Sequence, residues 1–130
     1  MPRWMFVLMV GLTLILAGCQ AADSEKGFTD ISATELSTML ESKDFVFINT
    51  HIPYEGEIEN TDAFIPFDEL ERYADQLPAD KGAKIVLYCR SGRMSEIAAA
   101  ELAQQGYDNI YELDGGMIAW EEAGFPLIGK

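Results

Sequence analysis

The sequence of 130 residues contains few metal-binding side chains and few basic ones. Two cysteines and one histidine are too few for a structural zinc site, which usually takes four such ligands, so we expect no metal. Nine Lys and Arg residues stand against 22 Asp and Glu residues, and the net charge is −13. Nucleic acids and anionic lipid surfaces are bound through basic faces. We therefore expect no nucleic-acid partner.

The N-terminal segment lacks an apolar run long enough to cross a bilayer. After Arg3, the residues from Trp4 to Ala17 carry no ionisable group, and this run of about fourteen is shorter than the roughly twenty that a membrane span needs. Its length is typical of a signal-peptide core, and it ends in Leu16-Ala17-Gly18-Cys19, which resembles the bacterial lipobox. An ordinary signal peptide with an incidental cysteine, or an uncleaved anchor, is the alternative.

The lipobox resemblance divides the chain into three parts. Residues 1–18 would be a lipoprotein signal peptide, residues 19–27 a tether lipidated on Cys19, and residues 28–130 the folded domain. We expect an extracytoplasmic protein held by lipid on a bacterial membrane, at the periplasmic side of an outer membrane or on the outer face of the cell membrane. With Cys19 lipidated, Cys89 has no partner in the chain, so its thiol is expected to be buried or used.

Apolar spacing predicts strands that alternate with helices. The expected strands are 45–49, 63–65, 84–88 and 109–113, and the expected helices are 33–42, 67–76, 95–105 and a last one through residue 123. Ser32 and Glu35 form a capping-box pattern before the first helix. Such alternation predicts an α/β fold with a mainly parallel central sheet flanked by helices on both faces. Ligands bind at the carboxyl ends of such strands, where Cys89 lies.

The loop that begins at Cys89 has the composition of an anion-binding site. Arg90 and Arg93 place two positive charges beside the sulfur, and the start of the following helix adds backbone N–H donors. Such surroundings favour a nucleophilic thiolate. Gly92 allows a tight turn, and serine hydroxyls can donate to an anion or cap the helix; they belong to Ser91 and Ser95.

This loop, Cys89-Arg90-Ser91-Gly92-Arg93-Met94-Ser95, resembles the active-site loop of the rhodanese (sulfurtransferase) family. The family's closing motif is similar to the final segment Leu113-Asp114-Gly115-Gly116-Met117-Ile118-Ala119-Trp120. The resemblance covers roughly residues 28–130 and implies a single rhodanese-like domain.

The resemblance also implies a chemistry. Cys89 would take sulfane sulfur from a small anionic donor such as thiosulfate, hold it as a persulfide and pass it to a thiophilic acceptor, a protein or a thiol. The donor would be bound by the rest of the loop, namely Arg90, Ser91, Gly92, Arg93, Met94 and Ser95. The family implies no cofactor.

The segment after the first strand departs from the family pattern. Asn49 stands where the family has aspartate, the arginine of that motif is absent, and His51 is not at the usual histidine position. We interpret His51 as an exposed loop residue, with a position lining the site as the alternative. The neighbouring side chains are interpreted as a solvated face and not as a general base: Tyr54, Glu55, Glu57 and Glu59.

Two other functions stay open. A persulfide, redox or protein-docking module without turnover would keep the same loop, and a cysteine phosphatase uses a similar anion cradle. Phosphatases carry an arginine six residues after the cysteine, where this chain has Ser95. A thiol–disulfide oxidoreductase is disfavoured because no second cysteine follows at Cys-x-x-Cys spacing.

Overall fold

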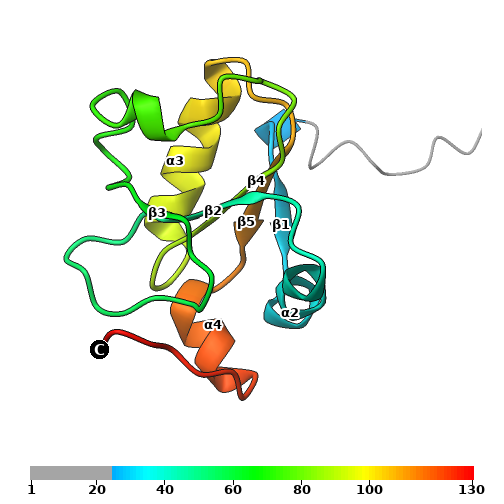
Figure 1. Cartoon of the computed structure of the whole chain (residues 1–130), viewed down its shortest axis with the longest axis vertical. Coiled ribbons are helices and arrows are strands. Elements are labelled where there is room, and N and C mark those ends of the chain that lie inside the picture. Colours follow the sequence, from blue (N-terminus) through cyan, green and yellow to red (C-terminus); the bar gives the residue numbers. More distant parts are fainter. Residues whose placement is uncertain (1–24) are drawn as a thin grey trace, which may run out of the picture.

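Five parallel strands form one sheet in the computed structural model, which describes residues 25–130 (Figure 1). The strand order is β1-β5-β4-β2-β3. The strands are β1 (Thr29–Ile31), β2 (Val46–Asn49), β3 (Ala63–Phe64), β4 (Ile85–Tyr88) and β5 (Ile110–Leu113). The helices are α2 (Ala33–Glu41), α3 (Arg93–Gln104), α4 (Gly116–Glu122) and the short 3₁₀ helix η1 (Ala74–Gln76).

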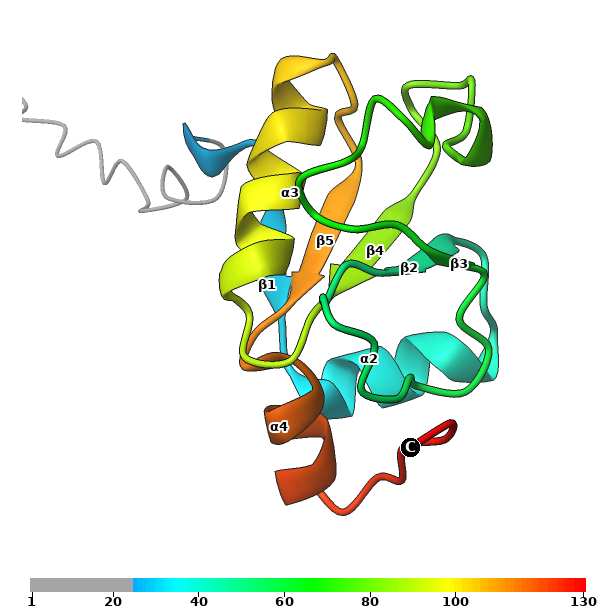
Figure 2. The same ribbon diagram turned by 90° about the vertical axis from the view of Figure 1, so that its left-hand side faces the viewer.

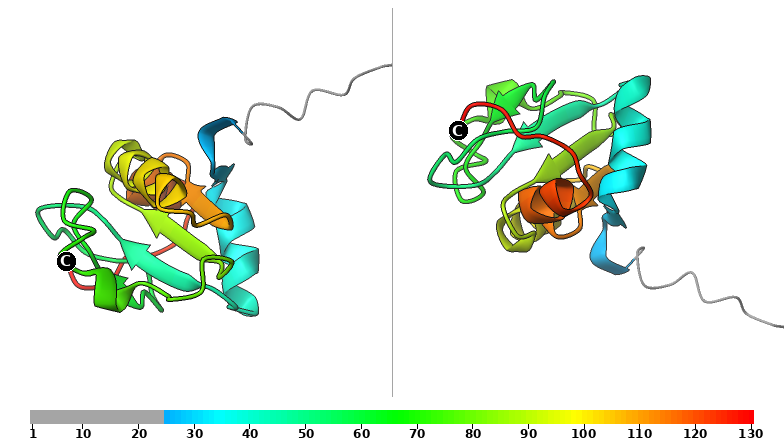
Figure 3. Two further views of the ribbon diagram at one scale, coloured as in Figure 1. Left: turned by 90° about the horizontal axis from the view of Figure 1, so that it is seen from above. Right: turned by 90° about the horizontal axis from the view of Figure 1, so that it is seen from below.

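Both faces of the sheet are covered, as the alternation of strands and helices predicts. Successive side chains of a strand point to opposite faces. In β4, Ile85 and Leu87 join the core beneath α3, whereas Val86 and Tyr88 join the core beneath α2 and α4. All four residues are buried, which is why this strand is an uninterrupted apolar run. Figure 3 (left) shows α3 on one side of the sheet and α2 on the other.

The expected strands and most expected helices are confirmed, with ends that differ by one or two residues. The capping box is present: Ser32 Oγ accepts from the Glu35 N–H at 3.1 Å, and Glu35 Oε2 accepts from the Ser32 N–H at 2.7 Å. The strand β1 was not predicted; its three residues pair with β5.

The predicted helix over residues 67–76 is wrong. Only Ala74–Gln76 is helical, as a 3₁₀ turn, and the segment is built mostly from bonds between residues three apart, such as Gln76 N–H to Tyr73 C=O at 2.9 Å. Pro66 and Pro78 leave a short stretch, and isolated short helices are only marginally stable. Leu70 and Leu77 instead enter the core beneath α3.

The carboxyl ends of the strands meet at one edge of the sheet, beside α4 and the β4–α3 loop (Figure 2). The C-terminal segment returns to this edge, where Ile128 pairs with Glu57 in an antiparallel bridge (Figure 3). Across residues 25–130, no helix has both the length and the apolar character that a membrane crossing demands. The signal peptide and Cys19 lie outside the described residues.

Candidate functional site

Cys89 lies at the end of β4 with its sulfur enclosed by hydrogen-bond donors. Its side chain is 1% exposed. The Gly92 N–H donates to Sγ at 3.0 Å, and the Ser95 hydroxyl lies 3.3 Å from Sγ in a donating geometry. Donors to sulfur stabilise its anionic form. The loop therefore suits a thiolate or a persulfide.

The local backbone explains how the loop reaches the sulfur. Gly92 is the N-cap of α3 with a φ of +103°, a left-handed conformation that glycine adopts without strain. The next residues form the first turn of α3, whose N–H groups have no carbonyl partner within the helix. These N–H groups and the positive end of the helix favour an anion beside the sulfur.

The Gly115-Gly116 pair holds α4 against the cysteine loop. The Met117 N–H donates to the Cys89 carbonyl at 2.9 Å, and the Ile118 N–H donates to the Arg90 carbonyl at 3.0 Å. Gly116 has a φ of +56°, and a Cβ there would lie 2.6 Å from the Arg90 carbonyl carbon. Only glycine allows this close approach, so the closing motif positions the sulfur loop.

The predicted donor-binding residues surround the sulfur but differ in their partners. Arg90 is 58% exposed, with Nη1 3.6 Å from Glu55 Oε2. Arg93 is exposed, and its guanidinium makes no ion pair or hydrogen bond with any residue in 25–130. Ser91 is exposed and Met94 is partly buried. Of the predicted set, Gly92 and Ser95 contact the sulfur, whereas Arg93 is available to an incoming anion.

The interpretation of His51 as an exposed residue is wrong. His51 is 8% exposed, its Nε2 lies 2.8 Å from Glu55 Oε2, and its N–H donates to Asn49 Oδ1 at 3.0 Å. Asn49 also donates from Nδ2 to the Gly56 carbonyl at 3.1 Å. Asn49 therefore folds residues 50–56 back over the strand end, and this fold buries the imidazole.

The side chains interpreted as a solvated face are mostly exposed, with Glu57 half-buried. Glu55 does more than face solvent, because it links His51 to Arg90.

Sequence reasoning missed Glu112, a buried carboxyl on β5. Its side chain is 0% exposed, Oε1 accepts from the Ser95 hydroxyl at 2.5 Å, and Oε2 has no hydrogen-bond partner among the described residues. Burial raises the pKa of Glu112 to about 8; the Ser95 hydrogen bond opposes this rise, and the nearby carboxylates add to it. The signal was an acidic residue inside the apolar strand Ile110–Leu113.

Three carboxylates, those of Asp30, Glu96 and Glu112, bring one oxygen each to within 4.8 Å of one another. We assign no metal there, because acidic side chains often cluster without an ion. The expectation of no metal and no cofactor stays a prediction.

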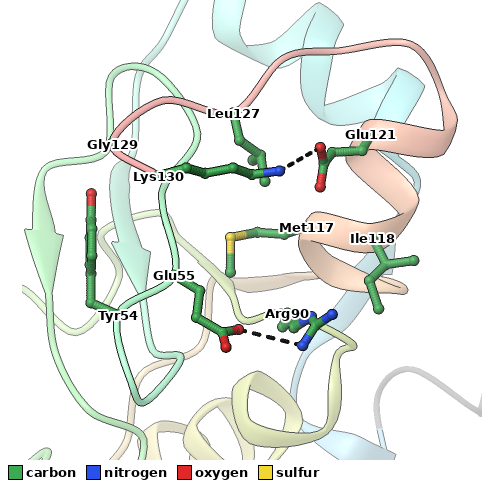
Figure 4. Close-up of a pocket in the computed structure, with 9 residues that line it drawn as sticks. All are labelled: Tyr54, Glu55, Arg90, Met117, Ile118, Glu121, Leu127, Gly129 and Lys130. Carbon is green, nitrogen blue, oxygen red and sulfur yellow. Dashed lines mark hydrogen bonds and ion pairs between the residues drawn. The ribbon is translucent and has the colours of Figure 1, made fainter.

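A pocket of about 400 Å³ lies beside the cysteine loop, between α4 and the segment that carries Tyr54 (Figure 4). Met117 and Leu127 line its apolar part, and Lys130 bonds Glu121 across it at 2.8 Å. Arg90 is shared with the cysteine loop, whereas Cys89 is not among the lining residues. The pocket is thus adjacent to the cysteine loop through Arg90.

The model of the rhodanese-like domain family matches residues 32–123, most of the described chain. The chain belongs to this family. This confirms the family resemblance, and with it the single rhodanese-like α/β domain.

Among curated relatives of this rhodanese-like chain are two proteins named tRNA uridine(34) hydroxylase. The one from Erwinia tasmaniensis is 29% identical over 95% of this chain and 39% of its own length. The one from Yersinia pestis is 34% identical over 77% of this chain and 32% of its own length. The chain therefore spans about a third of the length of these curated relatives.

Solved structures show the same rhodanese-like fold. A rhodanese-related protein from Thermoplasma volcanium is 28% identical, with a TM-score of 0.65 over 77% of this chain and 97% of its own. A protein of unknown function from Rhodopseudomonas palustris, described as a possible tyrosine phosphatase, is 25% identical, with a TM-score of 0.66 over 88% of this chain and 96% of its own.

Proposed function

We propose that this rhodanese-like domain is a sulfurtransferase that carries sulfane sulfur as a persulfide on Cys89. The observation that carries the proposal is the enclosure of Sγ by the Gly92 N–H and the Ser95 hydroxyl at the start of α3. These donors suit the anionic Sγ of the thiolate, and the N–H groups of the first turn of α3 suit the anionic outer sulfur of the persulfide. Arg93, which has no partner within residues 25–130, supplies a positive charge for the donor.

The proposed reaction is a double displacement. The Cys89 thiolate attacks the outer sulfur of thiosulfate, a new S–S bond forms, and sulfite leaves with the electron pair of the broken bond. A thiophilic acceptor then attacks the outer sulfur of the persulfide. The S–S bond breaks, its electron pair returns to Sγ, and the thiolate is regenerated without any external oxidant or reductant.

Intact mass tests the proposal directly. The full-length chain with Cys19→Ser, in which Cys89 is the sole thiol, is incubated with thiosulfate and then with cyanide. We expect the mass to rise by one sulfur atom, and cyanide to remove that atom as thiocyanate. The same chain with Cys89→Ser is the control and should gain nothing. No gain by a folded, reduced chain would contradict thiosulfate as the donor and favour a docking module without turnover.

A second candidate function comes from the curated relatives, which are named as tRNA hydroxylases. The relatives are about three times as long as the matched segment, and this chain has a net charge of −13. We therefore propose that the cysteine loop is the shared part and that this chain does not bind tRNA by itself. A gel-shift titration with total tRNA at low salt tests this, and binding that declines with salt would favour the second candidate.

The phosphatase alternative is tested with p-nitrophenyl phosphate. Ser95 occupies the position where phosphatases carry arginine, and its hydroxyl lies at the sulfur and not at a phosphate site. We expect no hydrolysis that depends on Cys89.

We also propose that lipid on Cys19 holds the domain at the outer side of a bacterial membrane. Fatty-acid labelling in cells should mark the wild-type chain and leave the Cys19→Ser chain unlabelled. Labelling of neither chain would contradict the lipoprotein proposal.

A further inference from the structure

Three side chains form a line from the sulfur into the sheet. Cys89 follows β4, Ser95 lies in the first turn of α3, and Glu112 lies in β5. The Ser95 Oγ is 3.3 Å from Cys89 Sγ and 2.5 Å from Glu112 Oε1. All three side chains are buried, so water does not compete for these contacts.

The Ser95 hydroxyl has more acceptors than protons. Cys89 Sγ, Glu112 Oε1 and the Gly92 carbonyl, 3.1 Å away, all lie where they can accept from it. A serine hydroxyl carries one proton. Which acceptor receives that proton depends on whether Glu112 is an acceptor or a donor.

Glu112 changes from donor to acceptor when it ionises, because only its neutral form carries a proton. The charged groups that face it are carboxylates on three elements: Asp30 on β1, which is bonded to Lys26 at 2.6 Å; Glu96 on α3; and Asp114 after β5. Together with burial, they favour the neutral carboxyl, whose pKa is raised to about 8. In this neutral form Glu112 can donate to Ser95 Oγ, whereas the ionised form accepts the Ser95 proton across the same 2.5 Å contact.

We propose that Glu112 is a positioning residue for Cys89, because its neutral carboxyl occupies the Ser95 oxygen and leaves the Ser95 proton for the sulfur. This inference rests on the proposed role of Cys89 as the reacting thiol. When Glu112 ionises, it accepts the Ser95 proton, and the sulfur loses a donor. A second negative charge then lies one side chain behind the sulfur. The thiolate then has one hydrogen-bond donor fewer, and the added negative charge repels anionic reagents from it.

A pair of alkylating reagents separates this effect from ionisation of the thiol itself. Neutral iodoacetamide and anionic iodoacetate both react with the thiolate, so the ratio of their rates cancels the thiolate fraction. Full-length chain with Cys19→Ser is the protein used, between pH 6 and pH 10. We expect the ratio of the iodoacetamide rate to the iodoacetate rate to rise about threefold or more, with a midpoint near pH 8.

Three variants test the assignment. Glu112→Gln keeps a permanent donor to Ser95, so it should retain the reactivity seen at pH 7 and give a ratio that does not change with pH. Glu112→Met has similar volume and no donor, so at pH 7 it should react with both reagents more slowly than Glu112→Gln. The matched control is Glu96→Gln, an exposed member of the same carboxylate cluster, which should keep the rise in the ratio.

Each result decides between named outcomes. A flat ratio in the parent chain, or an equal rise in Glu112→Gln, would overturn the inference, provided circular dichroism shows the chains folded. A rise near pH 8 that Glu112→Gln abolishes would support it. Because alkylation requires no sulfur donor, this result stands even if thiosulfate fails to load Cys89, so failure of the sulfurtransferase proposal is seen separately.

Discussion

At the scale of the single residue, Tyr88 connects the strand that carries the sulfur to the loop beside it. Its hydroxyl accepts from the Ile58 N–H at 3.0 Å and lies 2.7 Å from Thr61 Oγ1, and burial raises the pKa of Tyr88 to about 12. Tyr88→Phe leaves a buried N–H without its partner, which costs about 1–3 kcal/mol. We expect urea unfolding of Tyr88→Phe to show a free energy of unfolding that is lower by this amount. The control is Tyr107→Phe, which strands only the Pro78 carbonyl and should lose less. Equal losses would contradict this account.

Arg93 and Arg90 are both exposed, yet the structure predicts that they contribute unequally to binding of the sulfur donor. Arg90 is paired with Glu55, whereas Arg93 has no partner within residues 25–130. We expect Arg93→Ala to raise the KM for thiosulfate about fivefold, because one unpaired charge near an anion is worth on the order of 1 kcal/mol. Arg90→Ala should raise it less. Alkylation by neutral iodoacetamide should stay unchanged in both variants; equal KM values would count against this role of Arg93.

At the scale of the element, the contact between α4 and the cysteine loop depends on Gly116. A Cβ at this position would overlap the backbone of residues 89 and 90. Gly116→Ala should lower the free energy of unfolding by about 1–3 kcal/mol and slow persulfide formation, because the loop must move. Gly106→Ala is the matched control: its φ is also positive, at +99°, but a Cβ there meets nothing within 4 Å. It should show a smaller loss of stability and an unchanged rate. A normal rate in Gly116→Ala would contradict the positioning role of α4.

The elements also show what sequence patterns can predict. The buried strand β4 and the capping box of α2 follow from local rules of side-chain periodicity and hydrogen bonding, so both are predicted correctly. The three-residue strand β1 depends on its pairing with β5, which no local pattern records. Residues 67–76 have helical apolar spacing, but Leu70 and the following Leu77 reach the core from a series of turns.

The candidate site also has one part that the local sequence predicts and another that it does not. The Cys89 loop is continuous in sequence and could be predicted, whereas the contact of Glu112 with Ser95 joins residues 17 apart. Likewise, the burial of His51 follows from tertiary bonds made by Asn49, and these bonds leave no local signature.

At the scale of the whole molecule, the buried Glu112 makes stability depend on pH. Its pKa is raised from 4.5 to about 8 in the folded chain, so the folded state binds more protons than the unfolded state between these values. The free energy of unfolding therefore falls as pH rises through this window, by several kcal/mol in total. Glu112→Gln removes the titrating group. We expect urea unfolding to show this variant gaining stability over the parent chain from pH 5 to pH 9, with no such trend below pH 4.5.

The net charge of −13 could also make the free energy of unfolding fall as pH rises, because carboxylates throughout the chain lose their protons over the acid range and then repel one another. Two observations separate the effects. Repulsion among surface carboxylates is screened by salt, whereas the cost of a buried charge is screened much less, so the difference between Glu112→Gln and the parent chain should persist at 0.5 M NaCl. Glu59→Gln removes one exposed carboxylate and should show no difference that grows above pH 5. If Glu59→Gln matched Glu112→Gln at pH 9, general charge repulsion would explain the trend, and burial of Glu112 would not.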